Sequence, residues 1–562
     1  MTSHAVRSRL AALVLLAVSI VSLAISPFSN IDPINLIKVL ALSSLGFAAI
    51  PLVLWLAKNK FSQLSPVLTF TSIAFFLWMV IVFLVSGAPL NQQFWGVFGR
   101  NTGFLTYISL LLVLLGSAVV QHKDFYRKLV HALVVVSIPV LIYATIQFLG
   151  RDPISWSQMA PFGTFGNINF SSAFFGMSAV AMSTLAIQHG IHLLWRLTLI
   201  AIVAFKIFLI GSTGSIQGIL IFLAGCSVVF FFFIISHQKL KRLKFPYLAL
   251  ALAGLGLAIA GLLNSGPLAR FIFGETVLFR YDYWYAGWMM TLRNPLFGVG
   301  LDSYGDWYRQ LRGEVATLRT VPDRITNSAH NIYLDISSGG GLPLLLFYLM
   351  ILVIAGRSAI ESLKRMEAFD PILTALTAVW VAYLVQAAIS INQVGVGVWG
   401  WAFTGALIGY ARVRNSSETR SKKLQSHTTK NLGESNQMPI SVSLMSLAAF
   451  AIGFVLAFIP FRADSEFRTA QESGSLSSMV SAATSLGSTA YHLEISLDSA
   501  VQSNDITQAD AITEELLRRY PRDFMAWRVR QVLTNSTPEE REEAYQMLRE
   551  LDPYNPEVQR TP

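Results

Sequence analysis

The sequence predicts an all-α, polytopic membrane protein with about thirteen transmembrane helices, a large and partly helical outer loop, and a helical C-terminal domain. Of its 562 residues, 53% are hydrophobic and only 13% are charged, with a mean hydropathy of +0.53, whereas soluble domains carry roughly 25% charged residues. Apolar runs of roughly 18 to 25 residues, the length that crosses a bilayer, recur along the chain. Helices are required there because backbone polar groups must pair within each span.

The expected spans are separated by short polar loops, apart from one long polar segment at 265–340. A polar linker precedes the last of them. They cover residues 8–26, 34–57, 66–87, 103–121, 127–149, 169–187, 193–211, 213–236, 247–264, 341–360, 372–391, 395–411 and 439–460.

The distribution of Lys and Arg predicts the orientation of these spans. Short cytoplasmic loops are enriched in both residues. With the N-terminus inside, the inner segments carry most of them, and the short outer loops hold only Arg100 and Arg151. The loop at 265–340 and the C-terminus then lie outside the cytoplasm. The net charge of +10 is explained by basic cytoplasmic loops beside anionic lipid, so nucleic-acid binding is not expected.

Changes in composition divide the chain into a membrane core at 1–411, a cytoplasmic linker at 412–438, a last transmembrane helix at 439–460 and an extracytoplasmic tail at 461–562. The tail shows helical spacing of its apolar residues. Tyr520-Pro-Arg-Asp523 recurs as Asp552-Pro-Tyr-Asn555, at an offset close to the period of about 34 residues of tetratricopeptide repeats. Two copies are a weak repeat signal, and a plain helical tail with coincidental turn residues is the alternative.

A few charged or titratable side chains stand out near the outer ends of the spans, where such groups are costly unless they pair or serve a function. Arg280 precedes Trp284 by one helical turn, and His330 is the only histidine of the long loop. Imidazole takes up a proton near neutral pH. For Arg100 and Lys206 the alternative is snorkelling to the interface, and for the tryptophan it is an interfacial aromatic belt.

Several motifs together resemble the family of bacterial O-antigen ligases and O-antigen polymerases, with the related protein O-oligosaccharyltransferases. The resemblance covers about residues 60–411 and follows the family order. It rests on Gly99-Arg100-Asn-Thr-Gly103, Gly163-Thr-Phe-Gly-Asn-Ile-Asn169, Arg280 with Trp284, Asn294-Pro-Leu-Phe-Gly-Val-Gly300 and Ala329-His330-Asn331-Ile-Tyr333.

The resemblance implies a glycosyltransferase of the bacterial cytoplasmic (inner) membrane that acts in lipopolysaccharide or cell-surface polysaccharide biosynthesis. The donor would be an undecaprenyl-diphosphate-linked glycan, and the acceptor a hydroxyl of a glycan, glycolipid or protein on the outer face. His330 would be the catalytic base, and Arg100 and Arg280 would hold the diphosphate, since a guanidinium fork suits phosphate oxygens. Further substrate-binding candidates are Trp284, Asn331, Asn169, Lys206 and Gln217.

The chain departs from the family at one position, because many relatives carry Arg where Ser215-Ile-Gln217-Gly218 stands here. Lys206, one helix earlier, is the cation expected to replace it. No Asp-x-Asp occurs in the sequence, so we expect metal-independent chemistry and no cofactor. Four acidic residues of the long loop are the alternative base: Asp282, Asp302, Asp306 and Asp323.

Other classes of protein remain as alternatives. A transporter or flippase of lipid-linked glycans would also have many helices with rare buried charges, but it would show paired halves, and we see no such symmetry. A membrane-anchored scaffold would explain the tail, which we expect to bind a protein partner or position the acceptor. Within the transferase class, the sequence does not separate ligase from polymerase.

Overall fold

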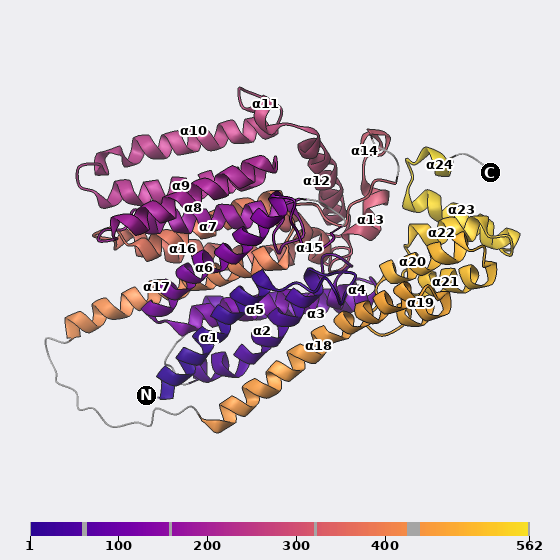
Figure 1. Cartoon of the computed structure of the whole chain (residues 1–562), viewed down its shortest axis with the longest axis horizontal. Coiled ribbons are helices and arrows are strands. Elements are labelled where there is room, and N and C mark those ends of the chain that lie inside the picture. Colours follow the sequence, from indigo (N-terminus) through magenta and orange to yellow (C-terminus); the bar gives the residue numbers. More distant parts are fainter. Residues whose placement is uncertain (1, 59–63, 157–159, 320–322, 424–438, 560–562) are drawn as a thin grey trace.

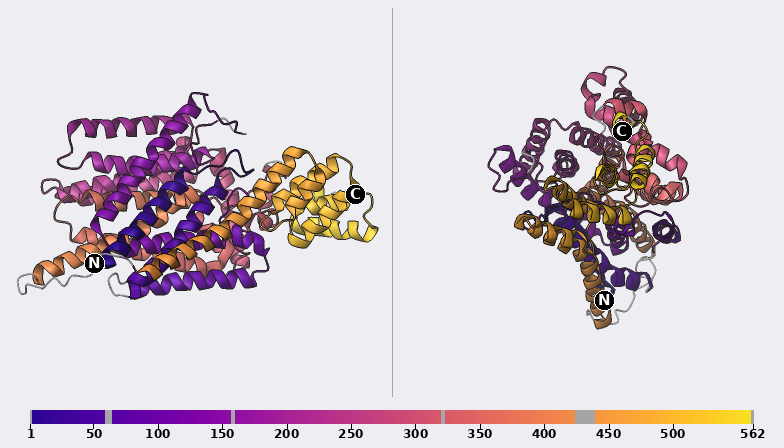
Figure 2. Two further views of the ribbon diagram at one scale, coloured as in Figure 1. Left: turned by 60° about the horizontal axis from the view of Figure 1, so that its bottom comes forward. Right: turned by 90° about the vertical axis from the view of Figure 1, so that its right-hand side faces the viewer.

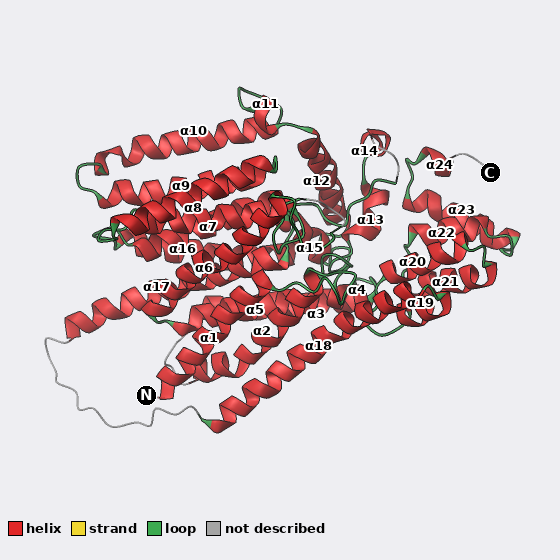
Figure 3. Cartoon of the chain, in the orientation of Figure 1, coloured by secondary structure: helices red, strands yellow, loops and turns green. Residues whose placement is uncertain are grey.

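The computed structural model describes residues 2–58, 64–156, 160–319, 323–423 and 439–559. These ranges fold into helices without a strand (Figure 3). The helices that precede the long loop are α1 Thr2–Leu23, α2 Asn35–Lys58, α3 Pro66–Val85, α4 Leu90–Trp95, α5 Phe104–Val120, α6 Lys123–Phe148, α7 Ile168–Ala186, α8 Leu193–Ser212, α9 Ile216–Ser236, η1 Lys241–Leu243 and α10 Lys244–Leu262.

The remaining helices form the long loop, the last spans and the tail (Figure 1). They are α11 Ala269–Ile272, α12 Glu275–Arg293, α13 Tyr304–Leu311, α14 Glu314–Arg319, α15 Ile332–Lys364, α16 Pro371–Ile389, α17 Val394–Lys423, α18 Ile440–Ser473, α19 Leu476–Ala483, α20 Ala490–Gln502, α21 Ile506–Arg519, α22 Phe524–Val532, α23 Pro538–Leu551 and α24 Pro556–Gln559.

The prediction of an all-α, polytopic membrane protein is confirmed. In the described part of the chain, 12 helices are long and apolar enough to cross a membrane, and the shorter apolar helix α5 occupies the remaining expected span. Three spans extend well beyond the predicted limits, and one of them is α17, which runs to Lys423. Of the other two, α15 already begins at Ile332 and kinks at Gly341 (φ 76°, ψ 175°), while α18 continues without a break to Ser473.

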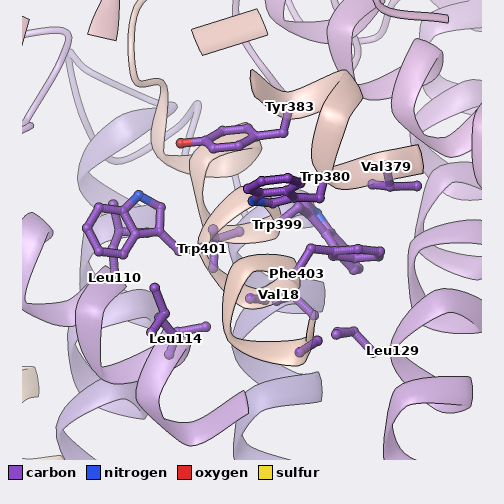
Figure 4. Close-up of a cluster of buried hydrophobic side chains, with 14 of the residues drawn as sticks. Val18, Leu110, Leu114, Leu129, Val379, Trp380, Tyr383, Trp399, Trp401 and Phe403 are labelled. Carbon is purple, nitrogen blue, oxygen red and sulfur yellow. The ribbon is translucent and has the colours of Figure 1, made fainter. Parts of the chain in front are cut away.

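The centre of the bundle is α17, whose apolar stretch is 100% buried, whereas the same measure is 6% for the peripheral α10. Figure 4 shows the buried side chains of Trp399, Trp401 and Phe403 among neighbours from α1, α5, α6 and α16. Small residues permit this packing. A Cβ on Gly405 would overlap the carbonyl oxygen of Leu114 on α5, so glycine brings the two backbones together as in other membrane helix pairs.

The C-terminal tail consists of α19 to α24, together with the end of α18. The two related turns of the tail lie at equivalent places, one between α21 and α22 and the other between α23 and α24. The sequence repeat is thus matched by a repeated helix–turn–helix, and the tetratricopeptide-like assignment stays a prediction. Figure 2 shows the tail beyond one end of the bundle, with the N-terminus toward the opposite end. We call the end beside the tail the tail end.

Two sets of contacts fix the tail to the membrane part. Asp464 of α18 accepts hydrogen bonds from the backbone N–H of Ile31 (2.7 Å) and lies 3.0 Å from Nε2 of His492 in the tail. Farther along, Arg312 of the long loop donates to both carboxylate oxygens of Asp552 (2.9 and 2.7 Å), with both side chains buried. The tail is therefore packed against the long loop.

The expected linker at 412–438 lies largely outside the described residues. α17 continues into it as far as Lys423, and residues 424–438 are outside the described ranges.

Candidate functional site

The glycine motifs of the long loop join it to the beginning of α15. Two backbone hydrogen bonds connect them: Val299 N–H donates to the carbonyl of Ser338 (2.7 Å), and Gly300 N–H donates to the carbonyl of Gly339 (3.1 Å). A Cβ on Gly341 would overlap the carbonyl oxygen of Leu296. Glycine at the kink thus allows the backbone of α15 to contact the backbone of the long loop. This contact holds the start of α15, which follows His330, beside the loop.

Arg100 is the centre of a buried ion cluster. Its Nη2 lies 3.4 Å from Asp302 and 3.6 Å from Asp335, with 5% of the side chain exposed, and Nη1 donates to the carbonyl of Asn327. Burial lowers the pKa of Arg100, but the carboxylates of Asp302 and Asp335 outweigh it and the net shift is upward. The guanidinium predicted to bind diphosphate is thus already neutralised by two carboxylates in this structure.

Asp302 and Asp335 bind the surrounding loops as well. Asp302 accepts from Val97 N (2.9 Å) and from the hydroxyl of Thr102 (2.9 Å). Asp335 accepts from Ser328 Oγ (2.8 Å) and Ala329 N (2.8 Å). Because the second pair of bonds fixes the two residues before His330, the Arg100 cluster positions the backbone of that histidine.

His330 is half-buried and its imidazole lies against Tyr283 of α12, with ring centroids 5.4 Å apart and planes inclined by 30°. Neither ring nitrogen has a hydrogen-bond partner among the described residues. Burial, and then the charges of Arg280 and Arg100, lower the pKa of His330 to about 4. The ring is therefore neutral at pH 7, and a nitrogen lone pair is available to accept a proton.

Arg280 lies on α12 close enough to His330 for its charge to act on the imidazole. Burial lowers the pKa of Arg280, with Tyr283 opposing the shift. Among the described side chains, none forms an ion pair or hydrogen bond with this guanidinium. A half-buried, unpaired cation is costly, and it suits the binding of an anion.

A second cation, Arg324, was not predicted from the sequence. Its guanidinium lies over the ring of Phe279 on α12, 3.9 Å from the centroid, and its charge acts on Tyr283 as that of Arg280 does. No carboxylate within the described ranges pairs with it. The long loop holds several arginines, so the sequence offered no signal that selected this one.

Two further candidates have mainly local roles here. Asn331 is the N-cap of α15, where its side-chain oxygen accepts from Tyr333 N (3.0 Å) and Leu334 N (3.2 Å). Trp284 lies one turn after Arg280, and its buried indole N–H has no hydrogen-bond partner in the described part of the chain. The indole therefore remains a free donor on the Arg280 face of α12.

The other three candidates form separate clusters. Asn169 accepts from Ser215 Oγ (2.9 Å) and, through its carbonyl, from Gln217 Nε2 (3.4 Å), which joins α7 to the start of α9. Lys206 is fully buried and donates to the hydroxyls of Ser137 (2.6 Å) and Ser178 (2.7 Å). Within the described part of the chain, none of these contacts involves His330 or Arg280.

The four acidic residues considered as the alternative base are all engaged. Asp282 pairs with Arg319 (2.5 Å), and Asp306 accepts from Gln92 Nε2 (2.7 Å). The exposed Asp323 pairs with Arg309 (3.3 Å). Asp302 is engaged as well, through the hydrogen bonds given above. His330, whose ring nitrogens have no partner among the described residues, is therefore more available as a proton acceptor than these four carboxylates. Across the described ranges, no group of three or more His, Cys, Asp or Glu side chains is placed to hold a metal ion.

Backbone strain gathers at the same place. Six non-glycine residues in the described chain have positive φ, and three of them belong to the site: Asn101 (54°), Asp302 (54°) and His330 (51°). The left-handed conformation costs such residues roughly 1–2 kcal/mol each. Strain of this kind persists where surrounding contacts enforce it and is often associated with function.

The fold and the site define a polytopic membrane protein with a cationic, histidine-containing site at the tail end of the bundle. Residues 198–349 match the family model described as O-antigen ligase, a stretch that begins in α8 and includes Arg280 and His330. This match over part of the chain supports the O-antigen ligase family, whose ligases and polymerases act on glycans, and at a coarse level it supports a glycosyltransferase-like membrane enzyme. No curated protein matches the sequence.

Proposed function

We propose that this protein transfers a glycan from an undecaprenyl diphosphate to an acceptor hydroxyl at the tail end of the bundle, on the outer face of the bacterial cytoplasmic membrane. The N-terminus would be cytoplasmic and the C-terminus periplasmic or extracellular. The observation that carries the proposal is a guanidinium, Arg280, that has no partner among the described residues and whose charge acts on the imidazole of His330, inside the segment that matches the family.

The reaction follows from these two groups. The acceptor oxygen attacks the anomeric carbon of the glycan, and the bond from that carbon to the diphosphate oxygen breaks. A ring nitrogen of His330 takes the acceptor proton. Arg280, with Arg324 as a second cation, neutralises the charge that grows on the departing diphosphate. Arg100 has a positioning role, because its cluster holds the backbone before His330.

Diphosphate is already a good leaving group, so the geometry calls for no general acid. The guanidinium groups remain charged at any working pH and can replace a metal in stabilising the leaving group. We therefore propose a metal-independent reaction.

The test is release of undecaprenyl diphosphate from a synthetic undecaprenyl-diphosphate-linked oligosaccharide by the purified protein in detergent, with and without EDTA. We expect release that survives EDTA and is lost in His330→Ala. Wild-type release that required a divalent metal would contradict the metal-independent mechanism. Absence of release with candidate acceptors present, together with movement of the lipid-linked glycan between liposome leaflets, would favour a transporter.

The acceptor separates the two enzyme classes within the family. A ligase transfers to a lipid-anchored core or another surface anchor, and a polymerase to a second lipid-linked repeat. The tail, packed beside the site through Arg312 and Asp552, favours a distinct acceptor and thus a ligase. Addition of each acceptor class to the release assay distinguishes them by the product that forms.

A further inference from the structure

A cavity of about 880 Å³ lies between the long loop and the tail. Its walls come from the loop around α4, from α13, from residues 323–327 and from the starts of α20 and α22. The volume falls within the range of roughly 300–1,000 Å³ typical of small-molecule sites. No step of the proposed transfer uses it.

Asn327 joins this cavity to the candidate site. Its side chain is exposed and belongs to the cavity wall, while its backbone carbonyl accepts from Arg100. His330 follows three residues later. The short segment from Asn327 to His330 thus connects the cavity wall with the candidate site.

Aromatic rings with unused polar edges line the cavity. Tyr491 of the tail stacks on Phe98, with centroids 3.9 Å apart and planes inclined by 7°, and Trp307 lies under the guanidinium of Arg522 at 3.7 Å. The Tyr491 hydroxyl and the Trp307 indole N–H are both half-buried, and no described residue forms a hydrogen bond with either. Flat apolar faces with free polar edges are what a pyranose ring requires.

Carboxyl groups complete the wall. Burial and neighbouring carboxylates raise the pKa of Asp306 to about 7, and burial with Asp523 raises that of Glu494 to about 9. A protonated carboxyl both donates and accepts hydrogen bonds, as sugar hydroxyls do. An acyl chain would leave these polar groups unpaired.

We infer that the cavity between α13 and the tail binds an oligosaccharide segment next to the transfer site. The inference rests on the proposed function, since a sugar chain beside His330 comes either from the acceptor or from the donor glycan. It assigns the tail a direct role, because half of the cavity wall belongs to it.

The experiment is a titration of the full-length protein in detergent with lipid-free oligosaccharides, followed by calorimetry. One arm uses the oligosaccharide released from lipid-linked repeat units, and the other that released from the surface glycolipid of the same bacterium. The variants are Tyr491→Phe, which keeps the ring and removes the hydroxyl, and Trp307→Phe, which replaces the indole by a smaller aromatic ring without the N–H. Trp288→Phe is the matched control, because Trp288 is exposed and lies outside the cavity.

We expect saturable binding that each cavity variant weakens about tenfold, the effect of one lost hydrogen bond, and that Trp288→Phe leaves unchanged. Binding of the glycolipid oligosaccharide alone assigns the cavity to the acceptor, and binding of the repeat unit alone assigns it to the donor. His330→Ala should bind the oligosaccharide as wild type does, so a loss of catalysis can be told apart from a loss of binding in the cavity. Absence of saturable binding in both arms would overturn the inference, and so would binding by the cavity variants with the affinity of wild type.

Discussion

The ring of Tyr283 packs on the imidazole of His330, with centroids 5.4 Å apart and planes inclined by 30°. The same tyrosine lies within electrostatic reach of both Arg280 and Arg324. One aromatic side chain of α12 thus supports the proposed base and is close to the two cations. Neither ring nitrogen of His330 has a partner among the described residues, so either can meet an acceptor hydroxyl.

Replacement of Tyr283 tests this support. We expect Tyr283→Leu to lower kcat by about 2- to 10-fold, matching the roughly 0.5–1.5 kcal/mol that an aromatic pair contributes, with KM for the donor little changed. Tyr283→Phe keeps the ring and should retain wild-type rates. Steady-state kinetics of both variants are the measurement, and a larger loss in the Phe variant would mean that the hydroxyl, not the ring, matters.

Arg100 and Arg280 should differ in what their removal does to stability. Arg100→Ala leaves two buried carboxylates, Asp302 and Asp335, without their cation, and breaking such a cluster costs about 3–5 kcal/mol. We expect a clearly lower thermal midpoint in detergent for this variant. Arg280→Ala removes an unpaired cation and should fold as well as wild type while losing transfer. Equal midpoints for both alanine variants would contradict the positioning role of Arg100.

The pH dependence of activity follows from the low pKa of His330. The base works only when neutral, so kcat/KM, which reports the free enzyme, should fall on acidification with a limb near the pKa of about 4. A bound diphosphate offsets the charges of Arg280 and Arg100 and favours imidazolium, so the limb of kcat should lie at higher pH. Rate profiles with saturating and with limiting donor check this order. An identical limb in both would mean that the diphosphate lies away from the histidine.

The buried pairing of Asp552 predicts how the tail is held. Asp552→Asn leaves Arg312 and Arg309 facing a neutral group, and Arg312 is only 1% exposed. We expect faster hydrogen–deuterium exchange in α13 and α22. Asp323→Asn is the matched control, because its carboxylate is exposed in the pairs with Arg309 and Arg528, and exposed ion pairs contribute little. Tail protection that survives in Asp552→Asn would argue that the Asp464 and His492 contact alone holds the tail.

The sequence predicted the membrane spans more completely than it predicted the site. Hydrophobic length predicts the membrane helices because the bilayer imposes it on each segment separately. The helix end after the span at 439–460 was a different case, since α18 continues through Pro460 to Ser473 and the change from apolar to charged residues does not end the helix. The expected span at 341–360 begins at Gly341, which is the kink of the longer helix α15.

Within the site, the sequence could single out Arg280 and His330 because few charged or titratable residues lie near the outer ends of the spans. It could not show that Arg100 is neutralised by Asp302 and Asp335, because those partners lie more than 200 residues away in the chain and only the fold brings them together. The capping role of Asn331 did have a local signal, an Asn directly before an apolar helical pattern.

The central claim is that Arg280 binds the diphosphate and His330 removes the acceptor proton. Its most direct test combines donor binding with single-turnover release of undecaprenyl diphosphate for wild type, Arg280→Ala and His330→Asn, the last of which tolerates the left-handed backbone. The account predicts that His330→Asn binds the donor as wild type does and releases almost none of its diphosphate, whereas Arg280→Ala loses binding. Release at the wild-type rate by His330→Asn would contradict it.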